Sequence, residues 1–215
     1  MNKQAGFTLI ELAIVLVIIG LLLGGVLRGQ ELINSAKVKN MARDFQNVQV
    51  YIYGYQDKYK AIPGDDMHAD THLTSGVNGP AGANLGNGVI NGDWKSGANP
   101  AASEAELFWQ HVRLAGLAPG PTAVGDANYY PTNADGGRIG ISSVSTFTGP
   151  AGLNGAYVVC SAGILGRFAK QIDTTLDDGE TSTGSVRVYA AAGWLPTTGA
   201  GGVDDSTPYN VCMAF

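Results

Sequence analysis

The chain has 215 residues, a formal net charge of −5 and no run of basic residues, so it has no electrostatic footprint of a nucleic-acid-binding protein. Its length suffices for one domain with a real core and is not clearly enough for two. Charged residues make up only 14% and glycine occurs 31 times, which predicts long irregular loops.

The N-terminus joins a short polar leader to a long apolar run. Residues 1–6 contain one basic side chain, Lys3, and in residues 7–27 the only charged side chain is Glu11. At about 1.5 Å per residue, a helix of this length spans the hydrocarbon core of a bilayer. A secretory signal is cut after a shorter apolar region. Here the plausible cut precedes the run, and cleavage would leave the anchor on the mature chain.

Glu11 is an unusual residue in such a helix, because an acidic side chain at the centre of a membrane span costs ~2.5–3.5 kcal/mol. One interpretation is that Glu11 pairs with the α-amino group that cleavage before Phe7 exposes, on the same chain or on a neighbour. Such a pair would set the register of stacked helices. The alternative is that Glu11 lies in the headgroup region and is solvated.

The segment Gly6-Phe7-Thr8-Leu9-Ile10-Glu11-Leu12 resembles the processing motif of prepilins, the precursors of type IV pilins and type II secretion pseudopilins. The resemblance implies a prepilin peptidase that cuts between Gly6 and Phe7 and N-methylates Phe7, with Glu11 setting the assembly register. Many pilins have a proline in the apolar run. This chain has Gly20, Gly24 and Gly25 instead, and we expect the flexible points of the helix there.

The resemblance also implies a place and a role in the cell. The subunit would be a single-pass protein of the bacterial inner membrane before assembly. It would then polymerise through its N-terminal helix, with the assembly machinery as partner, into an extracellular filament or a periplasmic pseudopilus. Adhesion and protein secretion are roles of such filaments. A membrane-tethered binding module that never polymerises is an alternative, and an anchored enzyme is disfavoured because no catalytic motif is present.

Apolar side chains recur at steps of three and four after the anchor, which predicts one face of a continuing helix. We expect one helix over residues 7–59, with an anchor at 7–27 and an amphipathic part at 28–60, packed on a head at 61–215. The stripe consists of Val38, Met41, Phe45, Val48, Ile52, Tyr55 and Tyr59.

The head is expected to be α+β and type IV pilin-like, with the long helix packed on a small antiparallel sheet. A helix over 103–114 is predicted, with Ser103 and Glu106 as a capping box, and a further helical piece over 165–176. Short β-prone segments occur at 138–141, 157–160 and 186–190.

Cys160 and Cys212 are the two cysteines, too far apart in sequence for a CxxC motif or a zinc knuckle. If the head is exported, a disulfide between them is the simple expectation, and it would tie the C-terminal tail to the head. Two buried free thiols are the alternative.

Three groups of residues are candidate metal ligands. Oxygen-rich side chains surround Gly179, and calcium prefers such ligands. The resemblance supports this interpretation, because major pseudopilins carry a calcium loop in this part of the head. An acidic surface turn is the alternative. A weaker candidate comprises Asn87, Asn91 and Asp93. The calcium candidates are Asp173, Asp177, Asp178 and Glu180.

The third group lies around His68 and His72, beside Asp65, Asp66 and Asp70. Histidines four residues apart could hold a metal if the stretch were helical. A solvated polar loop is favoured instead, because the group follows a Pro-Gly break and lacks an HExxH motif. The remaining histidine, His111, lies on the apolar face of its predicted helix and is expected in the core.

Overall fold

The computed structural model describes residues 8–80, 85–95, 103–149, 152–191 and 202–215. The chain divides into two compact units, Met1–Lys37 and Val38–Phe215. In chain order the elements are α1 (Leu9–Tyr59), α2 (Ala69–His72), α3 (Glu104–Leu114), β1 (Ile139–Ser143), the short 3-10 helix η2 (Val144–Thr146), β2 (Tyr157–Leu165), α4 (Gly166–Leu176), β3 (Val186–Ala190) and β4 (Pro208–Ala214).

The long N-terminal helix is present as one uninterrupted element, α1. It ends at Tyr59 because the next residue, Lys60, has a left-handed backbone with φ of 55°, and its N–H closes the last turn on the Gln56 carbonyl at 2.9 Å. Pro63, three residues later, cannot continue a helix. The predicted end of the helix is therefore confirmed.

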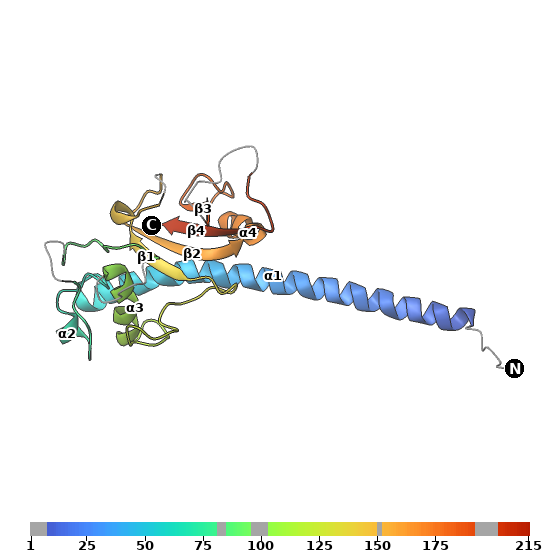
Figure 1. Ribbon diagram of the computed structural model, residues 1–215, viewed down its shortest axis with the longest axis horizontal. Helices are drawn as coiled ribbons and strands as arrows, with labels where there is room; N and C mark the ends of the chain where they lie inside the picture. Colours follow the sequence, from blue (N-terminus) through green and yellow to red (C-terminus); the bar gives the residue numbers. More distant parts are fainter. Residues whose placement is uncertain (1–7, 81–84, 96–102, 150–151, 192–201) are drawn as a thin grey trace. The chain divides into compact units, whose positions relative to one another are not determined.

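The apolar stripe on the second half of α1 forms part of the main core. Figure 1 shows the sheet lying along this half of the helix. Met41, Phe45 and Ile52 are at most 1% exposed and belong to one cluster with side chains of the sheet, α3 and α4. The amphipathic pattern thus correctly predicted the packed face, with Tyr59 only partly buried at its end.

The head is built on one four-stranded antiparallel sheet with the order β1-β2-β4-β3. The α+β class with a small antiparallel sheet is confirmed. Strands β1, β2 and β3 match the predicted β-prone segments, and α4 matches the predicted helical piece. Strand β4 was not predicted, although it pairs with both β2 and β3 and lies inside the sheet.

Both faces of the sheet are buried, which explains why β4 has no alternating apolar and polar pattern. Val159, Val211 and Met213 contribute to the main core, whereas their neighbours Cys160 and Cys212 point into a second, smaller core. That second core comprises Trp94, Leu153, Val158, Cys160, Tyr189, Cys212 and Ala214.

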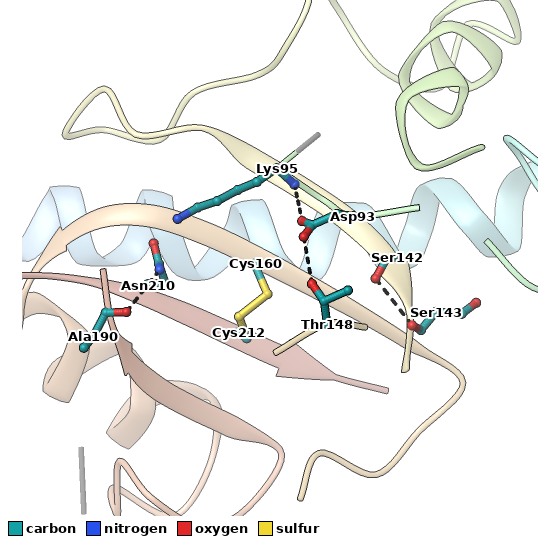
Figure 2. Close-up of a disulfide and its surroundings, with 9 residues drawn as sticks. All are labelled: Asp93, Lys95, Ser142, Ser143, Thr148, Cys160, Ala190, Asn210 and Cys212. Atoms are coloured by element: carbon teal, nitrogen blue, oxygen red, sulfur yellow. Dashed lines mark hydrogen bonds between the residues drawn. A yellow bond between two sulfur atoms is a disulfide. The ribbon is translucent and has the colours of Figure 1, made fainter. Parts of the chain in front are cut away.

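The predicted disulfide is present between Cys160 and Cys212. The two residues are direct partners across β2 and β4, with Cα atoms 4.1 Å apart, and Figure 2 shows the bridge joining the two strands. The bridge closes a separation of 52 residues. It therefore ties the C-terminal strand to the body of the head, and the free-thiol alternative is wrong.

The predicted capping box of α3 is not formed. Ser103 occupies the N-cap position, but its side chain makes no capping hydrogen bond. Glu106 is buried, with 1% of it exposed, and no hydrogen bond joins its carboxylate to the Ser103 N–H among the described residues. Glu104 is used instead, because its carboxylate accepts the Asn91 N–H at 2.8 Å and the Asn91 side-chain amide at 2.9 Å, which joins the preceding loop to the helix.

Candidate functional site

The apolar part of α1 is the first candidate site. Every side chain at positions 9–27 is exposed in the single chain, and by length and composition the helix could cross a membrane. At Gly20, Gly24 and Gly25 an added Cβ would meet nothing within 4 Å. Within the described residues no packing requires these glycines, and the helix is continuous through them.

Glu11 has a local partner at the start of α1. Its carboxylate accepts the Thr8 N–H at 2.8 Å and the Thr8 hydroxyl at 2.7 Å, and its own N–H lies 3.3 Å from the Thr8 hydroxyl oxygen. This is a reciprocal capping box. The sequence signal Thr-x-x-Glu was available for it, but Thr8 was not recognised as a site residue.

The processing residues Gly6 and Phe7, like Lys3 of the leader, lie outside the described residues. The structure therefore shows Glu11 engaged with Thr8 and leaves the pairing with the Phe7 amino group as a prediction. Both interactions use the same carboxylate at the same end of the helix, so they can be separated by substitutions at Thr8 and Glu11.

An acidic group at the C-terminal end of α4 is the second candidate site. Carboxylate oxygens of Asp173, Asp177 and Asp178 lie within 4.8 Å of one another. Asp173 is on the helix and is fully buried, Asp177 follows the helix end, and Asp178 is exposed. Glu180 is not part of this group among the described residues, and its carboxylate accepts a hydrogen bond from the Ser182 hydroxyl at 3.3 Å.

The loop after α4 holds these carboxylates by backbone hydrogen bonds. The Gly179 N–H donates to Asp173 Oδ1 and the Val186 N–H to Asp177 Oδ2, both at 2.9 Å. Gly184, with φ of 71°, leaves the space for Asp177, because a Cβ there would lie 1.9 Å from Asp177 Oδ2. The loop residues thus fix the carboxylates close together although like charges repel.

Asp173 carries the strongest sign of a missing partner. Its Oδ2 is buried and has no hydrogen-bond partner within the described part of the chain. The pKa of Asp173 is raised to about 6, chiefly by burial and also by the charges of Asp178, Asp177 and Glu180, while the hydrogen bond from the Gly179 N–H acts to lower it. A buried orphan carboxylate beside two others suits a hard cation such as calcium.

The side chains of the weaker calcium candidate are engaged in hydrogen bonds of the loops. The Asn91 amide is used by Glu104, the Asn87 side chain accepts the Val89 N–H, and the two oxygens of Asp93 accept the Lys95 N–H and the Thr148 hydroxyl. Figure 2 shows the contacts of Asp93 near the disulfide. These side chains serve loop structure, and calcium binding by this group stays a prediction.

The histidine group differs from its predicted form. Residues 69–72 form the helix α2 rather than an irregular loop, and Asp66 is 1% exposed rather than solvated. Asp65 is also buried and accepts the Gly86 and Gly88 N–H groups. His111 is fully buried as predicted, with Nδ1 accepting the Gly64 N–H at 2.9 Å and Nε2 bound to the Val77 carbonyl at 2.7 Å.

Comparison with known proteins bears on the N-terminal segment. Residues 1–27 match the family model of the prokaryotic N-terminal methylation motif. Neither the curated proteins nor the solved structures include a significant match to the chain. The match covers the leader, the processing residues and the apolar run in which Glu11 lies, and the chain therefore carries the N-terminal signal of type IV pilins and pseudopilins.

Proposed function

We propose that the chain is a structural subunit of a type IV pilus or a related filament, anchored in the inner membrane before assembly and polymerised through α1. The observation that carries this proposal is the methylation motif at residues 1–27 on a helix whose apolar side chains at 9–27 are all exposed in the single chain. Such a surface needs lipid first and other copies of the helix later.

Processing gives the first test. The proposal expects purified protein to start at an N-methylated Phe7, after removal of residues 1–6 by prepilin peptidase. Mass spectrometry of the N-terminal peptide measures both changes. An intact Met1, or a cut beyond the apolar run, would refute the proposal.

Assembly gives the second test and can be tied to Glu11. Glu11→Ala should leave membrane insertion intact and prevent filament formation, because the register pair with a neighbouring Phe7 amino group is lost. Glu31→Ala is the matched control, since Glu31 is an exposed residue of the same helix that pairs with Arg28 at 3.0 Å. Electron microscopy of sheared material reads out filaments.

Thr8→Ala separates the two roles of Glu11. This variant removes the hydroxyl from the capping box and leaves the carboxylate for the amino group. If Thr8→Ala assembles and Glu11→Ala does not, the carboxylate acts between subunits. Equal defects would mean that only the cap matters, and normal filaments with Glu11→Ala would end the register argument. A membrane-bound protein that never forms filaments would favour the tethered binding module.

We further propose that the acidic group after α4 holds calcium, with Asp173, Asp177 and Asp178 as ligands and Glu180 beside them. This feature favours the pseudopilin alternative within the same class. Bound calcium would supply positive charge to the orphan oxygen of Asp173 and would join α4 to the loop before β3. The proposal is supported by the buried Oδ2 without a partner and by the close approach of the three carboxylates.

The calcium proposal predicts that Asp173→Asn has opposite effects on thermal stability without and with calcium. Without calcium, Asp173→Asn should raise the melting temperature, because a buried carboxylate beside like charges is removed. At a calcium concentration about 100 times Kd, binding stabilises the wild type by about 2.7 kcal/mol, and the variant loses this gain. Asp205→Asn is the control, since Asp205 is exposed and pairs with Lys170. Melting curves unchanged by calcium would contradict the proposal.

A further inference from the structure

Two histidines lie on one helical turn beside a pocket. The His72 N–H donates to the His68 carbonyl at 2.9 Å. This helical hydrogen bond places the two residues, four positions apart in sequence, on successive levels of the turn that forms α2. Their ring centres are 6.2 Å apart. Both line a pocket of about 480 Å³, as does Tyr59, which stacks on His72 with ring centres 5.3 Å apart. Figure 1 shows α2 beside the C-terminal end of α1.

One nitrogen of His72 is already held by the protein. Asp66 Oδ2 lies 2.7 Å from His72 Nδ1 and also accepts the Tyr55 hydroxyl at 2.7 Å. Asp66 Oδ1 accepts the His68 N–H at 2.9 Å. Because a carboxylate oxygen accepts, Nδ1 carries the proton in this contact, and in the neutral ring Nε2 keeps its lone pair. Metal-binding histidines are commonly oriented by a carboxylate in this way.

The two rings are close to the spacing of a shared ion. Imidazole nitrogens bind Zn²⁺ at ~2.0–2.1 Å, so two rings on one tetrahedral ion have centres about 5 Å apart. The observed separation of 6.2 Å is somewhat longer, so one ring has to turn when the ion binds. His68 is exposed, so its ring can turn toward the ion without disturbing the core. His111 cannot contribute, since it is fully buried and both of its nitrogens are engaged.

We propose that His68 and His72 bind a divalent first-row transition-metal ion, Zn²⁺ or Cu²⁺, with Asp66 as the positioning residue and water in the remaining coordination positions. Imidazole ligands favour these ions, whereas calcium prefers oxygen ligands. The thioether of Met67, which lines the same pocket, is a softer ligand that favours copper. This site is separate from the acidic group after α4 and does not depend on filament formation.

The test uses the full chain in detergent without a polyhistidine tag. Zn²⁺ is titrated by calorimetry, and Cu²⁺ is added for electron paramagnetic resonance, in which imidazole nitrogens split the copper signal. We expect one ion per chain and a two-nitrogen signature. His72→Gln and His68→Gln should each remove this signature. Asp66→Asn should lower the Zn²⁺ affinity about 10- to 100-fold, as loss of an outer partner does in metal sites.

Matched variants keep the outcome decisive. Asp70→Asn removes an exposed carboxylate from the same turn and should bind Zn²⁺ and Cu²⁺ like the wild type, as should Asp173→Asn. Melting curves in EDTA show which variants are folded, and Tyr55→Phe replaces Asp66→Asn if the latter unfolds. Three results would overturn the proposal: the wild type shows no two-nitrogen signal, the signal persists in His72→Gln, or it is lost in Asp173→Asn.

Discussion

Removing the covalent link between Cys160 and Cys212 should lower the free energy of unfolding of the head by about 4 kcal/mol. The perturbation is reduction of the wild type by dithiothreitol, which breaks the link and changes no other atom. Because the bridge joins β2 to the last strand, β4, reduction frees the segment that contains α4, β3 and the acidic loop in the unfolded chain.

The magnitude follows from the length of that segment. The cysteines are 52 residues apart in sequence, and cross-linking a loop of this length lowers the entropy of the unfolded chain by about 14 cal/mol/K. At 25 °C this corresponds to about 4 kcal/mol, a large part of the stability of an ordinary domain. Both half-cystines are fully buried, so reduction also leaves two thiols in the second core.

Urea unfolding of the full chain in detergent, followed by tryptophan fluorescence, measures this difference. Trp94 and Trp109 are both at most 3% exposed and report on the second core and the main core. The control is Cys160→Ala combined with Cys212→Ala, whose unfolding should not respond to dithiothreitol. A difference below about 1 kcal/mol between oxidised and reduced wild type would refute the loop-entropy reasoning.

Three further predictions concern single side chains of the head. Burial raises the pKa of Asp44 to about 6, so the contribution of this carboxyl to stability is present below about pH 4 and lost as the pH rises through 6. Asp44→Asn should therefore be more stable than the wild type by about 1 to 2 kcal/mol at pH 7 and equal to it near pH 4 in urea titrations; equal stability at both values would contradict this. Burial also lowers the pKa of the His111 ring, and protonation of Nδ1 would break the hydrogen bond from the Gly64 N–H. The contribution of His111 to stability is therefore fully present above pH 6.5, the ordinary pKa of histidine, and is lost as the pH falls below that value. The ring proton signals of His111 in NMR should titrate below pH 6.5, and a midpoint above that value would show the reasoning to be wrong. Arg113 donates to the carbonyl oxygens of Pro119, Pro121 and Tyr129, so Arg113→Lys should cost about 2 to 3 kcal/mol in thermal or urea unfolding, whereas a cost near zero would mean that the lysine ammonium reaches the same acceptors.

The long helix was predictable because its signals are local. An apolar run followed by a stripe at steps of three and four specifies a helix at every turn, and Pro63 marks its end. The acidic group after α4 was also visible, since Asp173, Asp177 and Asp178 are close in sequence and a helix end keeps them close in space. The methylation motif is likewise a contiguous segment.

Other features depended on contacts between distant segments. Strand β4 lies between two neighbours and is buried on both faces, so it has no period-two pattern. The capping box at Ser103 and Glu106 failed because tertiary contacts draw Glu106 into the core and bring Asn91 to Glu104. The opposite happened at Thr8 and Glu11, where no other element competes and the local motif forms.

The sequence by itself determined the apolar N-terminal helix, its amphipathic continuation, the class of the head and the pair of cysteines. Only the tertiary structure decided that Asp173 is buried with one oxygen unpartnered, and that Asp66 reaches both Tyr55 and His72. The physical reason is that helix periodicity and short motifs act within a few residues. Burial and the partner of a carboxylate depend on which remote elements cover it, and no short segment of sequence contains that information.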